Sequence, residues 1–392
     1  MDVISKGIWP SFSEDEALAV AEVVRSNKVN YWTGQIGREF EKSFAVWTGT
    51  TYAVALANGT LALDVALKAM GIGPGDEVIV TPRTFIASIS CVVSAGATPV
   101  FADVDPDSGN ISPATIAVRI TNKTRAIIAV HLAGWPCDMD GIMALASEHG
   151  LAVIEDCAQA HGAMIDDRKV GSIGHVGAWS FCQDKIMTTG GEGGMVTTND
   201  KALWSTMWSF KDHGKNWDAI YHREHAPGFR WVHDSFGTNW RMLEVQAVLG
   251  EIQLRHISAW TQRRTEIALR LADALSRHEQ VVRVPIPATN LRHAYYRQYG
   301  YVLPDGLRPD WSRDRIVAEL NTAGVQVLHG TCSEVYLEKA FDGTSYRPKT
   351  RLPVAKALGE TSLMFLTHPT IGDAELGRAI EAIDTVMSNA KR

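Results

Sequence analysis

The chain has 392 residues, of which 45% are hydrophobic and 21% charged, values near the average of globular proteins and far from those of disordered chains. Its formal net charge is −6 and it has no basic block, which argues against a nucleic-acid partner. We expect neither a signal peptide nor a spanning helix, because the N-terminus lacks a basic segment followed by an apolar run and no long uninterrupted apolar stretch occurs. The five cysteines show no paired spacing, so we predict a cytoplasmic protein without a disulfide framework or zinc site.

From about residue 50, helical periodicity alternates with short apolar runs. The pattern predicts helices over residues 61–70, 86–94, 113–120, 141–149 and 201–210. It predicts strands over residues 77–80, 99–102, 126–130, 152–154, 178–181 and 195–198. Since these runs are apolar on both faces, we expect an α/β fold with a mostly parallel sheet covered by helices.

Residues 214–234 interrupt this rhythm with aromatic and histidine residues in a polar setting, and we interpret them as a hairpin or a lid. A long helical stretch then runs from Arg241 to about Ser276. It leads to strand-like residues 301–303 and 326–328 and to a closing helix over 373–387. We therefore predict a large α/β domain over residues 1–250 and a smaller C-terminal α+β domain over 251–392.

Two residues suggest a cofactor. Lys185 follows a predicted strand and precedes a turn with four glycines, residues 190, 191, 193 and 194, and Asp156 ends the apolar run that begins at Leu151. Both side chains would emerge at the carboxyl ends of strands, where α/β sheets bind ligands. A lysine amine for a Schiff base and a carboxylate for a ring nitrogen are what pyridoxal 5'-phosphate requires. Taken singly, Lys185 is better explained as a surface lysine beside a flexible turn, whereas a helix N-cap explains Asp156 about as well as a cofactor contact does.

Other residues meet further needs of this cofactor. Gly59 and Thr60 open a predicted helix, whose N-terminus presents free N–H groups to an anion such as a phosphate, and Ser180 offers a second hydroxyl. Phe85 can stack on a flat ring, although core packing is the commoner fate of phenylalanine. Gln159 lies three residues after Asp156 and can reach a ring hydroxyl.

Several ordered motifs resemble those of the DegT/DnrJ/EryC1/StrS family of fold-type-I aminotransferases, which aminate keto sugars carried on nucleotides. The resemblance extends from about Asn30 to Leu254, and more weakly to the C-terminus. It depends on motifs at residues 32–34, 58–60, 73–80, 131–134, 155–160, 180–185, 191–194 and 239–246. It implies a mostly parallel seven-stranded sheet between helices, followed by a small C-terminal domain.

The resemblance also implies roles for individual residues. Lys185 would be the Schiff-base lysine, Asp156 the partner of the ring nitrogen and Gln159 a neighbour of the ring hydroxyl. The phosphate would be held by Gly59, Thr60 and Ser180, with Phe85 stacked on the ring. Asn239 would reach the phosphate from the neighbouring subunit, so we expect a homodimer with shared active sites.

The implied substrates are a nucleotide-linked keto-deoxy-sugar and, as amino donor, glutamate, in the synthesis of surface polysaccharides or glycoconjugates. The stretch from Thr188 to Met195 looks more like members that aminate C4 than C3, although it carries one extra glycine. Trp32 and His329 are candidate substrate contacts. The motif around His329 departs from that of many relatives, and a structural histidine is the alternative.

Three other functions are alternatives to amination of a nucleotide-linked sugar. Some relatives are sugar dehydratases with histidine in place of the Schiff-base lysine, and Lys185 favours amination over that reaction. A non-catalytic regulator that binds the cofactor is a second alternative, but no added DNA-binding segment is visible. A nicotinamide dehydrogenase is a third, and the glycine fingerprint that it requires is absent.

Overall fold

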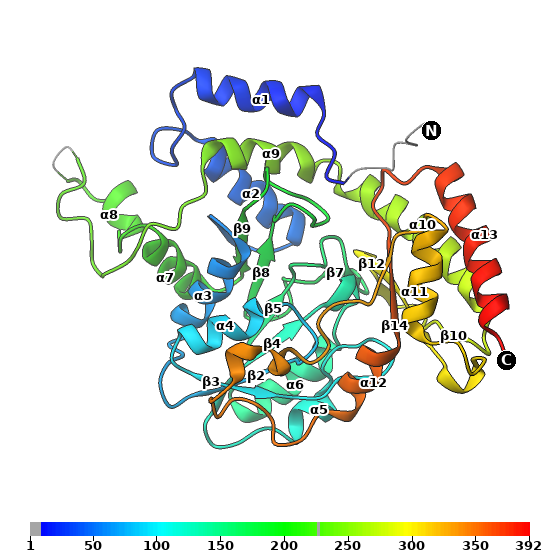
Figure 1. The fold of residues 1–392 in the computed structure, drawn as a ribbon. Coiled ribbons are helices and arrows are strands. Elements are labelled where there is room, and N and C mark those ends of the chain that lie inside the picture. The colour runs from blue at the N-terminus through cyan, green and yellow to red at the C-terminus, as the bar shows by residue number, and fades with distance from the viewer. Residues whose placement is uncertain (1–8, 226–227) are drawn as a thin grey trace.

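The computed structural model describes residues 9–225 and 228–392. At its centre lies a seven-stranded sheet in the order β1-β9-β8-β5-β4-β2-β3 (Figure 1). Strand β9 runs antiparallel to both of its neighbours, β1 and β8, whereas β8, β5, β4, β2 and β3 are parallel to one another. The predicted α/β fold with a mostly parallel seven-stranded sheet is confirmed. The strands are β1 (Tyr52–Leu56), β2 (Glu77–Val80), β3 (Thr98–Phe101), β4 (Thr124–Val130), β5 (Ala152–Asp156), β8 (Val176–Ser180) and β9 (Gly194–Thr198).

The five helices predicted between these strands are present, with ends that differ by up to three residues. They are α3 (Gly59–Ala69), α4 (Ala87–Ser94), α5 (Pro113–Ala117), α6 (Met139–His149) and α7 (Lys201–Lys211). Two helices before the sheet, α1 (Glu14–Arg25) and α2 (Ile36–Thr48), were not predicted from the sequence pattern. Together with α9 (Glu244–Leu254), they form a layer in which α1 and α2 pack on α9 and α2 also contacts β1 (Figure 1).

The stretch predicted as one long helix from Arg241 to Ser276 is two helices, α9 and α10 (Ile257–Ser276). The last turn of α9 tightens, because the backbone N–H groups of Arg255 and His256 donate to Ile252 and Gln253, three residues back. Such tightening commonly ends a helix. The chain therefore leaves the layer formed by α1, α2 and α9 and enters the C-terminal region.

The aromatic-rich segment 214–234 projects from one side of the molecule and carries the short helix α8 (Trp217–Tyr221) (Figure 1). Its two arms pair, since Lys215 forms an antiparallel bridge with His233 and the Asn216 N–H donates to the Val232 carbonyl. This agrees with the hairpin alternative, although residues 226 and 227 lie outside the described part of the chain.

The C-terminal region contains a four-stranded antiparallel sheet in the order β10-β12-β14-β13. Its strands are β10 (Val282–Arg283), β12 (Arg297–Val302), β13 (Val327–Leu328) and β14 (Ser362–Leu366), and α10, α11 (Arg313–Thr322) and α13 (Asp373–Ala390) pack beside it (Figure 1). Helix α12 (Pro353–Thr361) precedes β14, and a small sheet joins β6 (Met164–Ile165), β7 (Arg168–Lys169) and β11 (Leu291–Arg292). The domain boundary at residue 250 stays a prediction. In the described residues, no helix is long and apolar enough to cross a membrane.

Candidate active site

A cavity of about 640 Å³ lies at the carboxyl ends of β5 and β8, beside the N-terminus of α3. Most of the predicted site residues line it, although they come from separate parts of the sequence. They are Gly59, Thr60, Phe85, Asp156, Gln159, Ser180 and Lys185. The structure therefore brings together an amine, a carboxylate, a helix N-terminus and an aromatic ring.

Lys185 lies on the loop between β8 and β9, and its side chain is half-buried. Its Nζ atom is 5.3 Å from the centroid of the Tyr296 ring. The backbone of the loop is fixed, since the Lys185 N–H donates to the Cys182 carbonyl over 3.1 Å and the Thr188 N–H donates to the Gln253 side chain over 2.8 Å. The lysine amine is therefore carried by an anchored loop and not by a free surface turn.

Three polar residues beside Lys185 were not predicted. The Tyr296 hydroxyl donates to the Asp184 carboxylate, and Arg297 Nη2 donates to both groups at 3.2 Å. Burial raises the pKa of Asp184, but the charge of Lys185, the Tyr296 hydrogen bond and the charge of Arg297 outweigh it, so the pKa is lowered. Burial also raises the pKa of Tyr296. Tyr296 lies in the C-terminal region, and no sequence motif connects it with Lys185.

Asp156 ends β5 with only 6% of its surface exposed. Its Oδ1 accepts the Ala158 N–H over 3.1 Å and its Oδ2 accepts the Ser88 hydroxyl over 2.8 Å. Gln159 is fixed by its carbonyl, which accepts the Ala133 N–H over 2.7 Å. The amide nitrogen of Gln159 is thereby left available as a donor.

Helix α3 begins at Gly59, and Asn58 caps it by accepting the Leu61 N–H over 3.0 Å. A Cβ atom at Gly59 would lie 2.5 Å from Ser180 Cβ and 2.9 Å from Ser180 Oγ, so glycine permits the helix to approach β8. The close approach gathers the free N–H groups of the first turn, the Thr60 hydroxyl and the Ser180 hydroxyl. Such a cradle suits a phosphate group.

Phe85 is 67% exposed although it is a large apolar residue, and it lines the cavity. Phe85 is therefore not part of the hydrophobic core. An exposed aromatic ring at a cavity offers a flat surface for a ligand.

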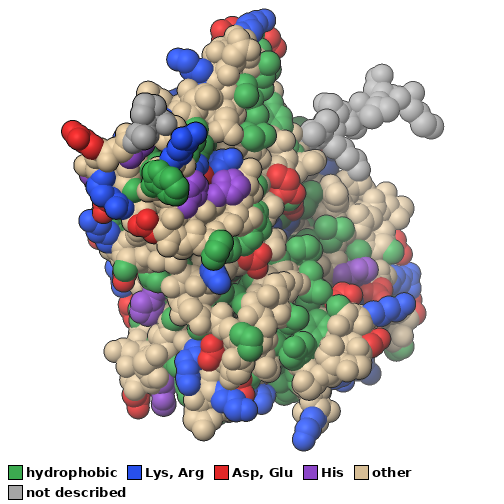
Figure 2. Space-filling model, turned by 90° about the vertical axis from the view of Figure 1, so that its left-hand side faces the viewer, with side chains coloured by type: hydrophobic (Ala, Val, Ile, Leu, Met, Phe, Trp, Pro, Cys, Tyr) green, Lys and Arg blue, Asp and Glu red, His purple; other side chains and the backbone are tan. Residues whose placement is uncertain are grey.

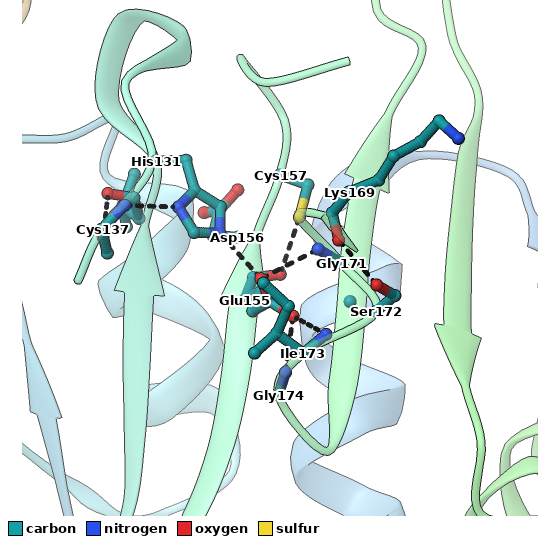
Figure 3. A network of polar contacts seen from close by, with 12 residues as sticks. His131, Cys137, Glu155, Asp156, Cys157, Lys169, Gly171, Ser172, Ile173 and Gly174 are labelled. Carbon is teal, nitrogen blue, oxygen red and sulfur yellow. Dashed lines mark hydrogen bonds and ion pairs between the residues drawn. The ribbon is translucent and has the colours of Figure 1, made fainter. Parts of the chain in front are cut away.

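A buried network behind Asp156 joins β4, β5 and the loop that follows β7 (Figure 3). The two Glu155 oxygens accept the N–H groups of Gly171, Ile173 and Gly174, and Glu155 Oε2 lies 3.0 Å from His131 Nε2. Burial raises the pKa of Glu155, but the His131 contact and the backbone donors lower it below its usual value.

Three residues of this region carry atoms that can bind a metal ion. The donor atoms of His131, Glu155 and Cys157 lie within 4.8 Å of one another. However, His131 Nδ1 accepts the Cys137 N–H, so Nε2 carries the proton that is donated to Glu155. Burial raises the pKa of the Cys157 thiol well above its usual value. The group is accordingly a hydrogen-bond network with its donors and acceptors already paired.

Three predicted residues lie outside the cavity. His329 has an exposed side chain 3.4 Å from Asp314, and Asn239 is exposed beside Asp212. Trp32 packs edge-on against Phe229 and Trp208, with Lys215 Nζ 4.1 Å from its ring centroid. A site within one chain therefore does not include these three, and their roles stay predictions.

Comparisons with known proteins agree with this geometry. The family model of the DegT/DnrJ/EryC1/StrS aminotransferase family matches residues 10–384. The GDP-perosamine synthase of Caulobacter vibrioides is 38% identical over 363 residues, which cover 91% of this chain and 92% of that protein. A UDP-N-acetyl-3-dehydro-alpha-D-glucosamine 3-aminotransferase of Acidithiobacillus ferrooxidans is 37% identical over 89% of this chain and 88% of that protein.

Among solved structures, an aminotransferase from Psychrobacter cryohalolentis superimposes with a TM-score of 0.97 at 61% identity, covering 98% of this chain and 99% of that one. A family-model match over nearly the whole chain, together with identities of this size, establishes the family. The chain therefore belongs to the DegT/DnrJ/EryC1/StrS aminotransferases and is a pyridoxal-phosphate-dependent aminotransferase of the fold-type-I class.

Proposed function

We propose that this enzyme transfers the amino group of glutamate to a nucleotide-linked 4-keto-deoxy-sugar, and that Lys185 is the lysine that carries the cofactor. One observation supports the assignment most directly. Lys185 and Asp156 line one cavity with the N-terminus of α3 and the Ser180 hydroxyl, so an amine, an acid and a phosphate cradle converge on one space.

The residues of the cavity fit pyridoxal 5'-phosphate. Gly59, Thr60 and Ser180 would hold its phosphate, because the absence of a side chain at Gly59 lets the helix N-terminus meet the Ser180 hydroxyl. Asp156 would accept a hydrogen bond from the ring nitrogen and Gln159 would donate one to the ring hydroxyl. Phe85 would cover one face of the ring.

When bound, the cofactor serves as an electron sink for the bonds broken at the substrate carbon. The chain's own residues supply positioning and proton transfer. The Lys185 amine removes the proton from the donor's α-carbon and delivers a proton to the sugar carbon in the second half of the reaction. The Asp156 carboxylate would hold a proton on the ring nitrogen and so support the electron-accepting role of the cofactor.

The names of the relatives support a nucleotide-linked sugar as substrate class, since one is a GDP-perosamine synthase and the other acts on a UDP-linked 3-dehydro sugar. Because these two differ in nucleotide and sugar, neither is transferred to this chain. The choice of C4 rests on the Thr188–Met195 stretch. The glycines of this stretch make a tight turn, with Gly190 at φ +88° and Gly191 at φ +122°, conformations that favour glycine.

We further propose a homodimer in which Asn239 completes the partner's site. Around Asn239 lie buried polar atoms that have no hydrogen-bond partner within the described ranges, namely Asp212 Oδ2, Arg241 Nε and Trp32 Nε1. Buried polar atoms are rarely left unpaired in a complete assembly. A phosphate-bearing ligand held by a second copy would satisfy the donors among them.

The surface near these atoms also supports a dimer. Phe229, Trp231, Phe236 and Leu243 are exposed by 51%, 90%, 101% and 51%. Figure 2 views the side from which the α8 segment projects, and hydrophobic side chains are spread among the charged ones on this face. Three of these four exposed residues are aromatic, the class of side chain that is enriched at protein interfaces.

Subunit complementation tests the shared site. Lys185→Ala and Asn239→Ala homodimers should each be nearly inactive, whereas subunits mixed by denaturation and refolding should regain activity, because one site of the hybrid contains Lys185 and the partner's Asn239. If the hybrid is as inactive as its parents while size-exclusion chromatography shows a dimer, the shared site is wrong.

The activity is tested with a panel of nucleotide-linked 4-keto and 3-keto sugars and glutamate. The proposal predicts one molecule of 2-oxoglutarate for each amino sugar, with a 4-keto sugar preferred. Sugar dehydration without 2-oxoglutarate would favour the dehydratase alternative. Cofactor binding without turnover of any sugar in the panel would favour a regulator.

A further inference from the structure

The carboxylate of Asp156 is held by a chain of two buried hydroxyl groups. Its Oδ2 accepts a hydrogen bond from the Ser88 hydroxyl over 2.8 Å, and Ser88 Oγ lies 3.0 Å from Thr84 Oγ1. Ser88 is 1% exposed and Thr84 is 2% exposed, and both residues line the cavity. Water from the bulk solvent therefore does not compete for these hydrogen bonds.

The direction of each hydrogen bond follows from the number of protons. A hydroxyl group has one proton, and that of Ser88 is donated to Asp156. The Ser88 oxygen is therefore the acceptor toward Thr84, whose hydroxyl is the donor. Thr84 in this way fixes the rotamer in which Ser88 faces the carboxylate.

The backbone that carries the hydroxyls of Ser88 and Thr84 is held in place by hydrogen bonds. Ser88 belongs to α4, and the turn before α4 is tied to the C-terminal region by two backbone hydrogen bonds, from the Thr84 N–H to the Cys332 carbonyl and from the Val335 N–H to the Pro82 carbonyl. Arg83 Nη1 adds a bond to the Ser333 hydroxyl over 3.1 Å. Thr84 therefore lies where the turn before α4 contacts the C-terminal region.

We propose that Ser88, oriented by Thr84, is a positioning residue that aims the Asp156 carboxylate at the ring nitrogen of the cofactor; this rests on the role proposed for Asp156. Each carboxylate oxygen accepts one donor, Ser88 on Oδ2 and the Ala158 N–H on Oδ1. One donor on each oxygen prevents rotation of the carboxylate and leaves lone pairs for the ring N–H. Without Ser88, only the Ala158 N–H would restrain it.

The test measures the protonation of the ring nitrogen and not only turnover. Wild-type and variant enzymes are loaded with pyridoxal phosphate labelled with ¹⁵N in the ring, and the ¹⁵N chemical shift is recorded. Ser88→Ala should move the shift toward that of the unprotonated ring and lower kcat about tenfold, the effect of one buried hydrogen bond, while KM for glutamate changes little. Ser88→Thr retains a hydroxyl and should restore both values.

Ser90→Ala is the matched control, because Ser90 lies on the same helix and outside the cavity, and it should leave the shift unchanged. If Ser88→Ala does not fold, Thr84→Val is the second test. It removes the hydroxyl that orients Ser88 and should move the ¹⁵N shift in the same direction.

The outcomes separate this inference from the proposed function. A wild-type ¹⁵N shift in both Ser88→Ala and Thr84→Val, alongside a displaced shift in Asp156→Ala, would overturn the positioning role and leave Asp156 in place. A wild-type shift in Asp156→Ala would instead remove the role of Asp156 itself.

Discussion

The indole Nε1 of Trp9 donates a hydrogen bond to the backbone carbonyl of Lys185 over 2.8 Å, and so joins the N-terminal segment to the loop that carries the candidate lysine. The Trp9 ring also packs edge-on against Trp260 and lies 5.1 Å from the guanidinium of Arg264. A second connection runs from the Thr188 N–H through Gln253 to the Glu16 carboxylate. Trp9 and Glu16, which precede the sheet in the sequence, therefore help to hold the loop that carries Lys185.

Trp9→Phe keeps an aromatic ring at this position but removes the N–H donor. We expect the free energy of unfolding to fall by about 1 kcal/mol, and the affinity for pyridoxal phosphate to fall with it, because the backbone carbonyl of Lys185 loses its hydrogen-bond partner. Urea denaturation and a titration of apoenzyme with the cofactor measure these effects. Trp311→Phe is the control for loss of indole packing alone, because Trp311 is partly buried and packs against the C-terminal core. If Trp311→Phe lowers the unfolding free energy and the cofactor affinity as much as Trp9→Phe does, the hydrogen bond from Trp9 does not stabilise the loop that carries Lys185.

Gly59→Ala should weaken cofactor binding at least about tenfold, because the added methyl group would lie 2.5 Å from Ser180 Cβ and push the N-terminus of α3 away from β8. The dissociation constant of pyridoxal phosphate, measured on apoenzyme, reports this change. Gly377→Ala in α13 is the control, since its Cβ meets nothing within 4 Å. That substitution should leave the dissociation constant unaltered and stabilise the helix by up to about 1 kcal/mol. A wild-type dissociation constant in Gly59→Ala would contradict the proposal that the N-terminus of α3 and Ser180 hold the phosphate.

His161 predicts a pH dependence of stability. Burial, followed by the charges of Lys185 and Arg264, lowers the pKa of this fully buried histidine to about 3. Below about pH 6.5 the unfolded chain therefore binds a proton that the folded chain does not, and stability falls by about 1.4 kcal/mol for each pH unit as the pH decreases toward 3.

His161→Leu removes this titration and should reduce the slope of unfolding free energy against pH between pH 4.5 and 6 by about that amount. His293 and His368 have pKa values lowered by burial to about 3 and about 4, so part of the slope will remain. The exposed His329 serves as control through His329→Gln. An unchanged slope in His161→Leu would show that His161 is protonated in the folded enzyme.

Glu155→Gln should destabilise the fold by about 2–4 kcal/mol, because the new amide group would face N–H donors that now point at a carboxylate. Chemical denaturation measures the loss. Since the oxygens of Glu155 already accept bonds from Gly171, Ile173, Gly174 and His131, added chelator should leave the wild-type stability unaffected. A lower unfolding temperature in chelator would identify the group as a metal site.

The pattern of the sequence predicts the sheet well because the strands of a doubly covered parallel sheet are short, apolar and separated by amphipathic helices. It misses α2, in which Glu41 is buried in a 2.9 Å contact with Lys211 of α7. It also misses β1, a short apolar run whose neighbour in the sheet is the distant strand β9. A pattern of hydrophobic residues cannot predict that a charged side chain will be buried by a distant partner.

The cavity residues contributed by the central sheet could be predicted because Asp156 and Ser180 end strands and Gly59 begins a helix. Tyr296 and Ser88 could not, since the first reaches Lys185 only through the packing of the C-terminal region and the second is an ordinary helix residue in sequence. Trp32, Asn239 and His329 were predicted from motifs alone, and the single chain places them outside the cavity.

The assignment of Lys185 is tested most directly by reducing the resting holoenzyme with borohydride, digesting it and locating the pyridoxyl group by mass spectrometry. We predict the label on Lys185, in the peptide that contains Asp184, and its loss in Lys185→Ala. A label on another lysine, such as Lys169 or Lys215, would contradict it.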